Sequence, residues 1–160
     1  MLLLAENGKL LYCNWIGEEG KSKQKKFTGG YKEVVEGLDI EDMENPDSRV
    51  LAETGRQLDE YFNGNLKEFR LPLDFRGTPF QKKVWDALTK VGYGQTVSYG
   101  EIAKRIGNPK GMRAVAGACG ANPISIIVPC HRITSKSGIG GYTGGIEKKK
   151  FLMSVESILN

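Results

Sequence analysis

Residues 124 to 133 are Ile-Ser-Ile-Ile-Val-Pro-Cys-His-Arg-Ile, and the rest of the chain is organised around this stretch. The apolar run of residues 126–128 predicts a short buried strand, which ends at Pro129 because proline has no N–H to donate to a sheet. Cys130 and His131, the only histidine of the chain, follow directly. A thiol and an imidazole leaving the core together are typical of a reactive cysteine. The alternative is a structural cysteine beside a hydrogen-bonded core histidine.

The composition excludes several classes of protein. The 160 residues suffice for one ordinary domain or two small ones. No apolar run approaches a membrane-spanning length, and the opening Met-Leu-Leu-Leu-Ala reaches Glu6 too soon for a signal peptide. We therefore expect a protein of the cytoplasm, or of the nucleus in a eukaryote. The three cysteines, Cys13, Cys119 and Cys130, include no Cys-x-x-Cys pair. We therefore expect neither a disulfide framework nor a metal site.

Charge divides the chain into two unlike halves. Residues 1–75 carry ten Lys or Arg against fifteen Asp or Glu, whereas residues 76–160 carry thirteen against four. The basic second half predicts a surface that faces a polyanion, and a merely solvated lysine surface is the alternative. Salt dependence of binding distinguishes the two, because contacts to phosphate release counterions.

Residues 1–76 predict a small α/β module. Asn7-Gly8 between two apolar runs predicts a β-hairpin. The basic stretch Lys21–Lys26 predicts a loop or an edge strand. Helical apolar spacing over residues 46–62 predicts one helix, and alternation over residues 69–75 predicts an extended segment. Since none of these elements carries a chemical motif, a supporting role is predicted for the module.

Residues 77–160 predict a mainly helical domain. Thr78, Pro79 and Gln81 form a capping box at the start of its first helix. A second helix begins after Ser98, breaks at residues 107–111 and is followed by a third helix. Helix, short turn and helix form a helix-turn-helix arrangement. The predicted fold is thus a small α/β module followed by a helical domain with a helix-turn-helix.

The third of these helices, residues 112–120, consists almost entirely of small residues, with Arg113 as its one long donor. A helix that reads base edges in the major groove needs several long side chains, which this one lacks. A slim helix can instead approach phosphates closely or enter a narrow groove. Tight packing inside a protein core is the alternative.

Residues 137–145 are too rich in glycine for a regular element and predict a shaped loop, in which Tyr142 and Thr143 supply an aromatic face and a hydroxyl. A final helix follows. Its predicted apolar stripe consists of Phe151, Leu152, Val155, Ile158 and Leu159. Glu156 lies at the edge of this stripe, where a carboxylate needs a partner such as His131; a solvated Glu on an exposed face is the alternative.

The second half carries five motifs over about residues 78–158. In chain order they are Gly107-Asn108-Pro109-Lys110, Arg113-Ala114-Val115, Gly120-Ala121-Asn122-Pro123, Val128-Pro129-Cys130-His131-Arg132-Ile133 and Gly141-Tyr142-Thr143-Gly144-Gly145. Together they resemble the methylated-DNA-protein-cysteine methyltransferases, also called alkylguanine-DNA alkyltransferases. Members of that family carry a variable α/β domain before this region.

The resemblance implies a repair protein that turns a guanine alkylated at O6, or a thymine alkylated at O4, out of the duplex. The alkyl group would move to Cys130, which His131 would activate through a bound water. Glu156 would orient His131, and Asn122 would brace the active-site turn. Tyr99 would help to rotate the nucleotide and would donate a proton or hydrogen bond to the base.

The same resemblance implies the DNA-binding residues and the pocket. Arg113 would fill the gap in the base stack, and the other DNA contacts would come from Tyr99, Lys110, Ala114 and Gly117. The pocket would be lined by Tyr142, Thr143, Val128 and Pro129. Family members often have Ser in place of Thr143. The expected partner is double-stranded DNA with an alkylated guanine, bound by a monomer without cofactor or metal.

The chemistry predicts one turnover per chain, because water does not readily cleave the thioether product and the sequence offers no second nucleophile. Two other functions stay open at this point. A lesion-binding protein would flip the damaged base but have an inert Cys130. A Cys-His hydrolase would need the imidazole to reach the thiol directly and would turn over an ester or amide repeatedly.

Overall fold

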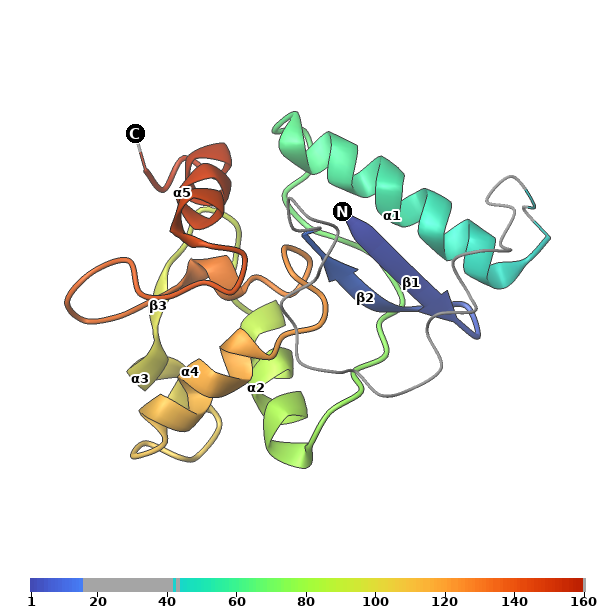
Figure 1. Cartoon of the computed structure of the whole chain (residues 1–160). Helices are drawn as coiled ribbons and strands as arrows, with labels where there is room; N and C mark the ends of the chain where they lie inside the picture. The colour runs from blue at the N-terminus through green and yellow to red at the C-terminus, as the bar shows by residue number, and fades with distance from the viewer. Residues whose placement is uncertain (16–41, 43, 160) are drawn as a thin grey trace.

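The computed structural model describes residues 1–15, 42 and 44–159 (Figure 1). Its elements in chain order are β1 (Leu2–Glu6), β2 (Lys9–Asn14), α1 (Pro46–Phe62), α2 (Pro79–Thr89), β3 (Val97–Ser98), α3 (Tyr99–Arg105), α4 (Met112–Gly120), the 3-10 turn η1 (Cys130–Arg132), β4 (Ile133–Thr134) and α5 (Ile146–Val155). The predicted fold class, a hairpin and helix followed by a mainly helical region, is confirmed. The predicted loop or edge strand Lys21–Lys26 lies outside the described residues.

The hairpin forms for the local reason that the sequence indicates. Asn7 and Gly8 both have positive φ, 52° and 69°, as a two-residue turn of type I′ requires. The Gly8 N–H donates to the Asp47 carboxylate at 2.6 Å, which ties the hairpin turn to the first turn of α1. Helix α1 lies along the hairpin (Figure 1). The extended segment 69–75 pairs with β2, since Leu10 N–H donates to Pro72 O at 2.8 Å.

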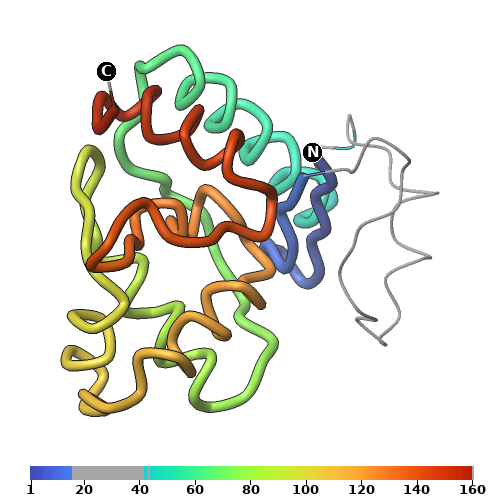
Figure 2. Tube along the Cα trace, turned by 60° about the vertical axis from the view of Figure 1, so that its left-hand side comes forward, coloured from blue at the N-terminus to red at the C-terminus, as the bar shows by residue number. Residues whose placement is uncertain are grey.

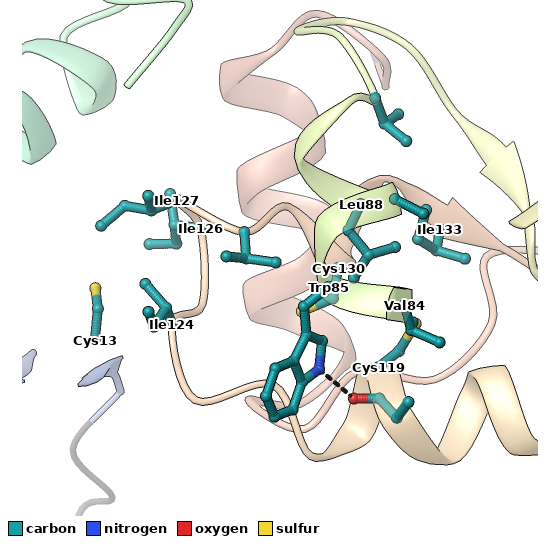
Figure 3. Close-up of a cluster of buried hydrophobic side chains, with 14 of the residues drawn as sticks. Cys13, Val84, Trp85, Leu88, Cys119, Ile124, Ile126, Ile127, Cys130 and Ile133 are labelled. Carbon is teal, nitrogen blue, oxygen red and sulfur yellow. Dashed lines mark hydrogen bonds between the residues drawn. The ribbon is translucent and has the colours of Figure 1, made fainter. Parts of the chain in front are cut away.

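The helical region begins with the predicted capping box. The Thr78 N–H donates to Gln81 Oε1 at 2.8 Å, and the Gln81 N–H donates to Thr78 Oγ1 at 3.2 Å. The Trp85 indole N–H of α2 donates to the Ala118 carbonyl of α4 at 2.9 Å in the core (Figure 3). Gly107, with φ 76°, lies in the turn between α3 and α4. The predicted helix-turn-helix is therefore confirmed.

Two further contacts place the cysteine segment. Strands β3 and β4 pair in parallel, with Val97 opposite Ile133, so the start of α3 lies beside η1. Helix α5 lies against the C-terminal end of α1 (Figure 2), where the rings of Phe62 and Phe151 stack with centroids 6.1 Å apart.

The predicted buried strand at residues 126–128 is wrong. The segment is a tight turn, in which the Val128 N–H donates to Ile124 O at 2.9 Å and Ile126 has φ 74°. Its apolar side chains are buried beside Cys13 (Figure 3), and the Ser125 N–H donates to Cys13 O at 2.7 Å. A short apolar run indicates burial, but it does not determine the backbone conformation.

The predicted apolar stripe of the last helix is also partly wrong. Helix α5 ends at Val155, and Ser157 follows with φ 56°. Ile158 and Leu159 therefore lie beyond the helix, and Phe151 is 51 % exposed. The buried residues of this segment are Lys149, Leu152, Met153 and Glu156. None of the described helices is long and apolar enough to cross a membrane. The division into domains 1–76 and 77–160 stays a prediction.

Candidate active site

The turn before Cys130 is held by the side chain of Asn122. Its Oδ1 accepts from the Ile124 N–H at 3.0 Å, and its Nδ2 donates to Val128 O at 2.8 Å. The same Nδ2 donates to the Cys130 Sγ at 3.2 Å. Asn122 is 3 % exposed, so water does not compete for these bonds. One amide thus fixes both the turn and the position of the sulfur.

Cys130 lines a pocket of about 420 Å³. The other lining residues are Tyr99, Ala116, Cys119, Gly120, Ser135, Gly140, Gly141, Tyr142 and Thr143. Burial raises the pKa of the Cys130 thiol, while the Asn122 hydrogen bond and the charge of Lys149 lower it. The resting side chain is therefore a thiol whose ionised form is disfavoured by desolvation.

The pocket wall unites segments that are far apart in the sequence. The Tyr99 hydroxyl of α3 donates to Gly141 O at 3.4 Å, and the Thr143 hydroxyl donates to Gly120 O at 2.8 Å. The Tyr142 hydroxyl accepts from the Trp15 indole N–H at 3.2 Å. The glycine-rich loop is thereby tied to both α3 and α4.

Two residues of the predicted pocket are absent from its lining. Val128 and Pro129 are both buried, and the side chain of Val128 has no exposed surface. Val128 contributes through its backbone, because its carbonyl accepts from Asn122 Nδ2 and from the Cys130 N–H at 2.8 Å each.

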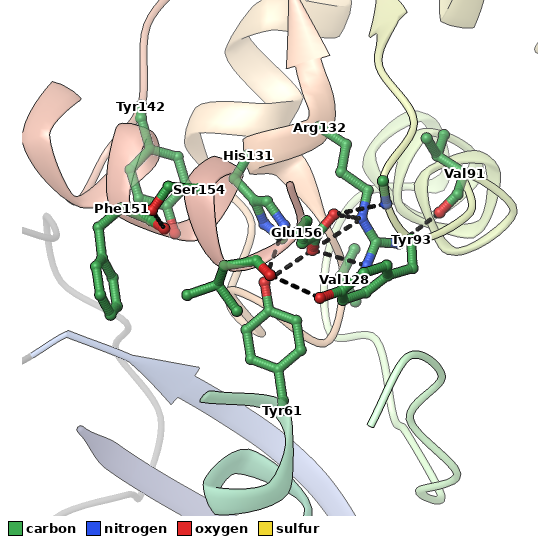
Figure 4. A network of polar contacts seen from close by, with 12 residues as sticks. Tyr61, Val91, Tyr93, Val128, His131, Arg132, Tyr142, Phe151, Ser154 and Glu156 are labelled. Carbon is green, nitrogen blue, oxygen red and sulfur yellow. Dashed lines mark hydrogen bonds and ion pairs between the residues drawn. The ribbon is translucent and has the colours of Figure 1, made fainter. Parts of the chain in front are cut away.

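His131 and Glu156 form the buried pair that the spacing of the sequence left open (Figure 4). His131 Nε2 lies 2.7 Å from Glu156 Oε1, and both side chains are fully buried. Arg132 completes the pair, with its Nε 2.9 Å from Glu156 Oε2 and its Nη2 2.9 Å from Oε1. The solvated-Glu alternative is wrong, since Glu156 is 2 % exposed.

These contacts determine which nitrogen of the imidazole carries the hydrogen. Burial would raise the pKa of Glu156, but hydrogen bonds from His131 and Arg132 lower it to about 2. The carboxylate is therefore ionised at neutral pH and can only accept, so His131 Nε2 carries the hydrogen. Burial lowers the pKa of His131, partly offset by Glu156, which keeps the ring neutral. Nδ1 is then an unprotonated acceptor, and it makes no hydrogen bond to any described residue.

Most of the residues that the resemblance assigned to DNA lie on the exposed face of α4 and in the turn before it. Arg113, Ala114 and Gly117 are exposed on it, and Lys110 is exposed in the turn before it. A Cβ added at Gly117 would meet nothing within 4 Å. The opposite face is buried through Val115, whose side chain has no exposed surface. The helix therefore packs against the core and also presents a slim outer surface.

Two functional candidates escaped the sequence reasoning. Lys149 is fully buried, and its Nζ donates to Ile133 O and Ile139 O at 2.6 Å each and to Gly141 O at 3.1 Å. Tyr61 is also fully buried and donates to Glu156 Oε1 at 2.7 Å. Lys149 precedes Glu156 by seven residues, a spacing that places both on one helix face and could have indicated its burial.

Comparison with known protein families agrees with this geometry. The family model of the 6-O-methylguanine DNA methyltransferase DNA-binding domain matches residues 79–158, and that of the ribonuclease-like domain of the same family matches residues 21–75. The chain belongs to the 6-O-methylguanine DNA methyltransferase family. The resemblance inferred from the five motifs is thereby confirmed.

Individual members of the methyltransferase family are similar over most of the chain. The methylated-DNA–protein-cysteine methyltransferase of Methanosarcina acetivorans is 45 % identical over 141 residues, which are 88 % of each chain. The constitutive enzyme of Bacillus subtilis is 46 % identical over 74 % of this chain and 73 % of its own.

Solved structures of this family agree in fold. The Mycobacterium tuberculosis protein crystallised in complex with DNA is 51 % identical, with a TM-score of 0.65 over 66 % of this chain and 65 % of its own. A Methanococcus jannaschii O6-methylguanine DNA methyltransferase is 29 % identical, with a TM-score of 0.65 over 99 % of this chain and 87 % of its own.

Proposed function

We propose that this chain repairs DNA by direct reversal, moving a methyl or larger alkyl group from O6 of guanine, and also from O4 of thymine, to the Sγ of Cys130. The observation that carries the proposal is the setting of that sulfur. It lines a pocket of about 420 Å³ and accepts a hydrogen bond from Asn122. The next residue, His131, belongs to a buried pair with Glu156. A nucleophile, a base and a fixed orientation are thus held together.

The damaged base must leave the duplex before it can enter the pocket. Extrusion costs a few kcal/mol, least where alkylation has already weakened pairing, so selectivity begins with the lesion. The slim outer face of α4 suits close approach to DNA through Ala114 and Gly117. Exposed Arg113 would fill the gap in the stack, and Lys110 would contact a phosphate.

The proton of the thiol passes to His131 Nδ1 through a bridging water. Nδ1 suits this role, because it is buried, unprotonated and without a hydrogen bond to any described residue. A Cys-His hydrolase needs a direct hydrogen bond between thiol and imidazole. Among the described residues the imidazole is instead hydrogen-bonded to Glu156. Asn122 holds the sulfur during proton removal.

The transfer step is a displacement at the alkyl carbon. The Cys130 sulfur forms a bond to that carbon as the carbon–O6 bond breaks, and the electron pair of the broken bond passes to the guanine ring. Tyr99 serves as the donor to this developing negative charge. Burial, together with the nearby Cys119 and Cys130 thiols, raises the pKa of the Tyr99 phenol, which keeps it protonated and able to donate.

Activation of the thiol is not the main source of rate. Relative to an ordinary thiol with a pKa near 8.5, which is about one-tenth ionised one unit below that pH, complete ionisation adds at most about tenfold, roughly 1.4 kcal/mol. Burial raises the pKa of Cys130, so proton removal by His131 must first offset that penalty. Alignment of Cys130 with the alkyl carbon, and donors directed at the departing guanine, must supply most of the barrier reduction.

The test incubates the protein with a duplex that carries one O6-methylguanine and locates the methyl group by peptide mass. We expect one methyl per chain, on Cys130, with no further turnover. Cys130→Ala should abolish transfer and still bind the duplex, whereas the control Cys13→Ala should retain transfer. Methyl on Cys13 or Cys119, or binding without any transfer, would overturn the proposal in favour of another acceptor or a lesion-binding protein.

The proposal extends to partner and compartment. The partner is double-stranded DNA with an alkylated guanine, bound by one copy of the chain without cofactor or metal. The compartment is the cytoplasm, or the nucleus in a eukaryote. The basic balance of residues 76–160, thirteen Lys or Arg against four Asp or Glu, supports a polyanionic partner.

A further inference from the structure

The active-site carboxylate receives a hydrogen bond from a helix that lies far away in the sequence. Tyr61, in the last turn of α1, donates its hydroxyl to Glu156 Oε1 at 2.7 Å, and the same hydroxyl oxygen lies 3.5 Å from His131 Nε2 (Figure 4). The Tyr61 side chain has no exposed surface. Its ring is fixed by aromatic neighbours, with centroid distances of 5.3 Å to Phe69 and 6.2 Å to Tyr93.

Tyr61 and His131 share one oxygen of Glu156 with Arg132. Oε1 accepts from the Tyr61 hydroxyl and from His131 Nε2, each at 2.7 Å, and from Arg132 Nη2 at 2.9 Å. Oε2 accepts from Arg132 Nε at 2.9 Å and from the Gly94 N–H at 3.1 Å. A carboxylate oxygen that accepts several hydrogen bonds attracts each donor less strongly. The phenol therefore reduces the pull of Glu156 on the imidazole and also prevents the carboxylate from rotating away from it.

We propose that Tyr61 is a positioning residue for alkyl transfer: by sharing Glu156 Oε1 with His131, it fixes the imidazole and limits the basicity of Nδ1. The inference rests on the proposed function. If Tyr61 has this role, α1 contributes a side chain to the active site although the helix bears no motif of its own. Its consequence is that the pH at which His131 gains a proton depends on a hydroxyl contributed by the first half of the chain.

Substitution Tyr61→Phe isolates this effect, because it removes the oxygen and keeps the ring. Glu156 then pulls more strongly on Nε2–H, so His131 should bind a proton at higher pH. The charged or titratable groups around the pair, Arg132, Lys149 and Tyr93, are unchanged. We expect transfer to slow by about tenfold, as is common when a partner behind a functional side chain is lost, and the acid limb of the pH–rate profile to move to higher pH.

The only histidine of the chain gives a readout that is independent of repair. Titration of the His131 imidazole by NMR should show an upward pKa shift in Tyr61→Phe relative to the unchanged protein. The matched control is Thr54→Val, which removes another fully buried hydroxyl of α1, one that donates to Val50 O at 2.7 Å and makes no contact with Glu156. Thr54→Val should lower thermal stability and leave the His131 titration unmoved.

The outcomes separate the two proposals. If the unchanged protein transfers no methyl group, the proposed function fails whatever the titration shows. If it transfers methyl but Tyr61→Phe moves neither the titration nor the pH–rate profile, the positioning role of Tyr61 is refuted. Equal shifts in Tyr61→Phe and Thr54→Val would also refute it, because they would show only a general loosening of α1.

Discussion

Glu156→Gln should destabilise the fold as well as slow the reaction. The substitution keeps the shape of the side chain but removes the charge that Arg132 and His131 share in the core. It leaves the buried Arg132 guanidinium without a counter-ion, and breaking such a pair costs about 3–5 kcal/mol. For a chain of this size that corresponds to a fall in Tm of about 10 °C.

The acid titration of stability gives a second estimate of the same quantity. The pKa of Glu156 falls from 4.5 to about 2 on folding, so its contribution is complete above pH 4.5 and is lost as the pH falls through about 2. The difference corresponds to about 3 kcal/mol. His131, whose folded-state pKa is also lowered, adds a loss of stability that begins below about pH 6.5.

The assay is chemical unfolding from pH 8 to pH 2, with Glu147→Gln as control. Glu147 lies in the first turn of α5, the helix that Glu156 caps, and its side chain is 85 % exposed. Among the described residues its one ion pair is with Lys150 at 3.0 Å, so its loss should change the free energy of unfolding by less than about 1 kcal/mol. Glu156→Gln should lose about 3 kcal/mol at neutral pH and should then lose less stability than the unchanged protein as the pH falls from 4.5 towards 2. If the two variants lose the same stability, the buried network does not hold the site together and the reasoning is refuted.

Three further predictions follow from single contacts. Lys149→Met removes a charge near Cys130 and three hydrogen bonds to carbonyls, so the pKa of the thiol should rise and its alkylation by iodoacetamide should slow at pH 7 to 8. In Gly117→Leu the new side chain extends into open space, so Tm should not fall. It thickens the slim outer face of α4, so duplex affinity measured by fluorescence anisotropy should drop at least about tenfold, which corresponds to about 1.4 kcal/mol. Arg113→Ala should slow repair in duplexes far more than reaction with the free modified base, and equal losses would exclude a role in the base stack.

Locally encoded features of this fold could be predicted from the sequence. The hairpin turn follows from Asn7 and Gly8, because few other residue pairs adopt two successive positive φ angles. The start of α2 follows from Thr78 and Gln81, which satisfy each other's backbone N–H groups. In each case the residues that determine the conformation lie within four positions of one another.

The turn before the cysteine could not be predicted, because distant residues determine it. The distant residues are in β2, where Cys13 O accepts from the Ser125 N–H and Asn14 Oδ1 accepts from the Ser125 hydroxyl. The Asn122 side chain adds a hydrogen bond to Val128 O from within the same segment. Ile126 is held at φ 74°, a conformation that is costly for a β-branched residue and that is compensated by its complete burial. Lys149 was missed for a similar reason: it stands in a Lys-Lys-Lys run, and its acceptors are carbonyls of a loop up to 16 residues away.

The buried position of the thiol suits a reaction that consumes the cysteine. A cysteine that ends as a thioether is consumed, so each reaction with a stray electrophile would remove one chain from repair. Burial raises the pKa of Cys130 and so lowers its thiolate fraction, tenfold for each unit of pKa. The Cys130 thiol thus reacts more slowly with free reagents. For the correct substrate, alignment of the alkyl carbon with the sulfur inside the pocket lowers the barrier to transfer.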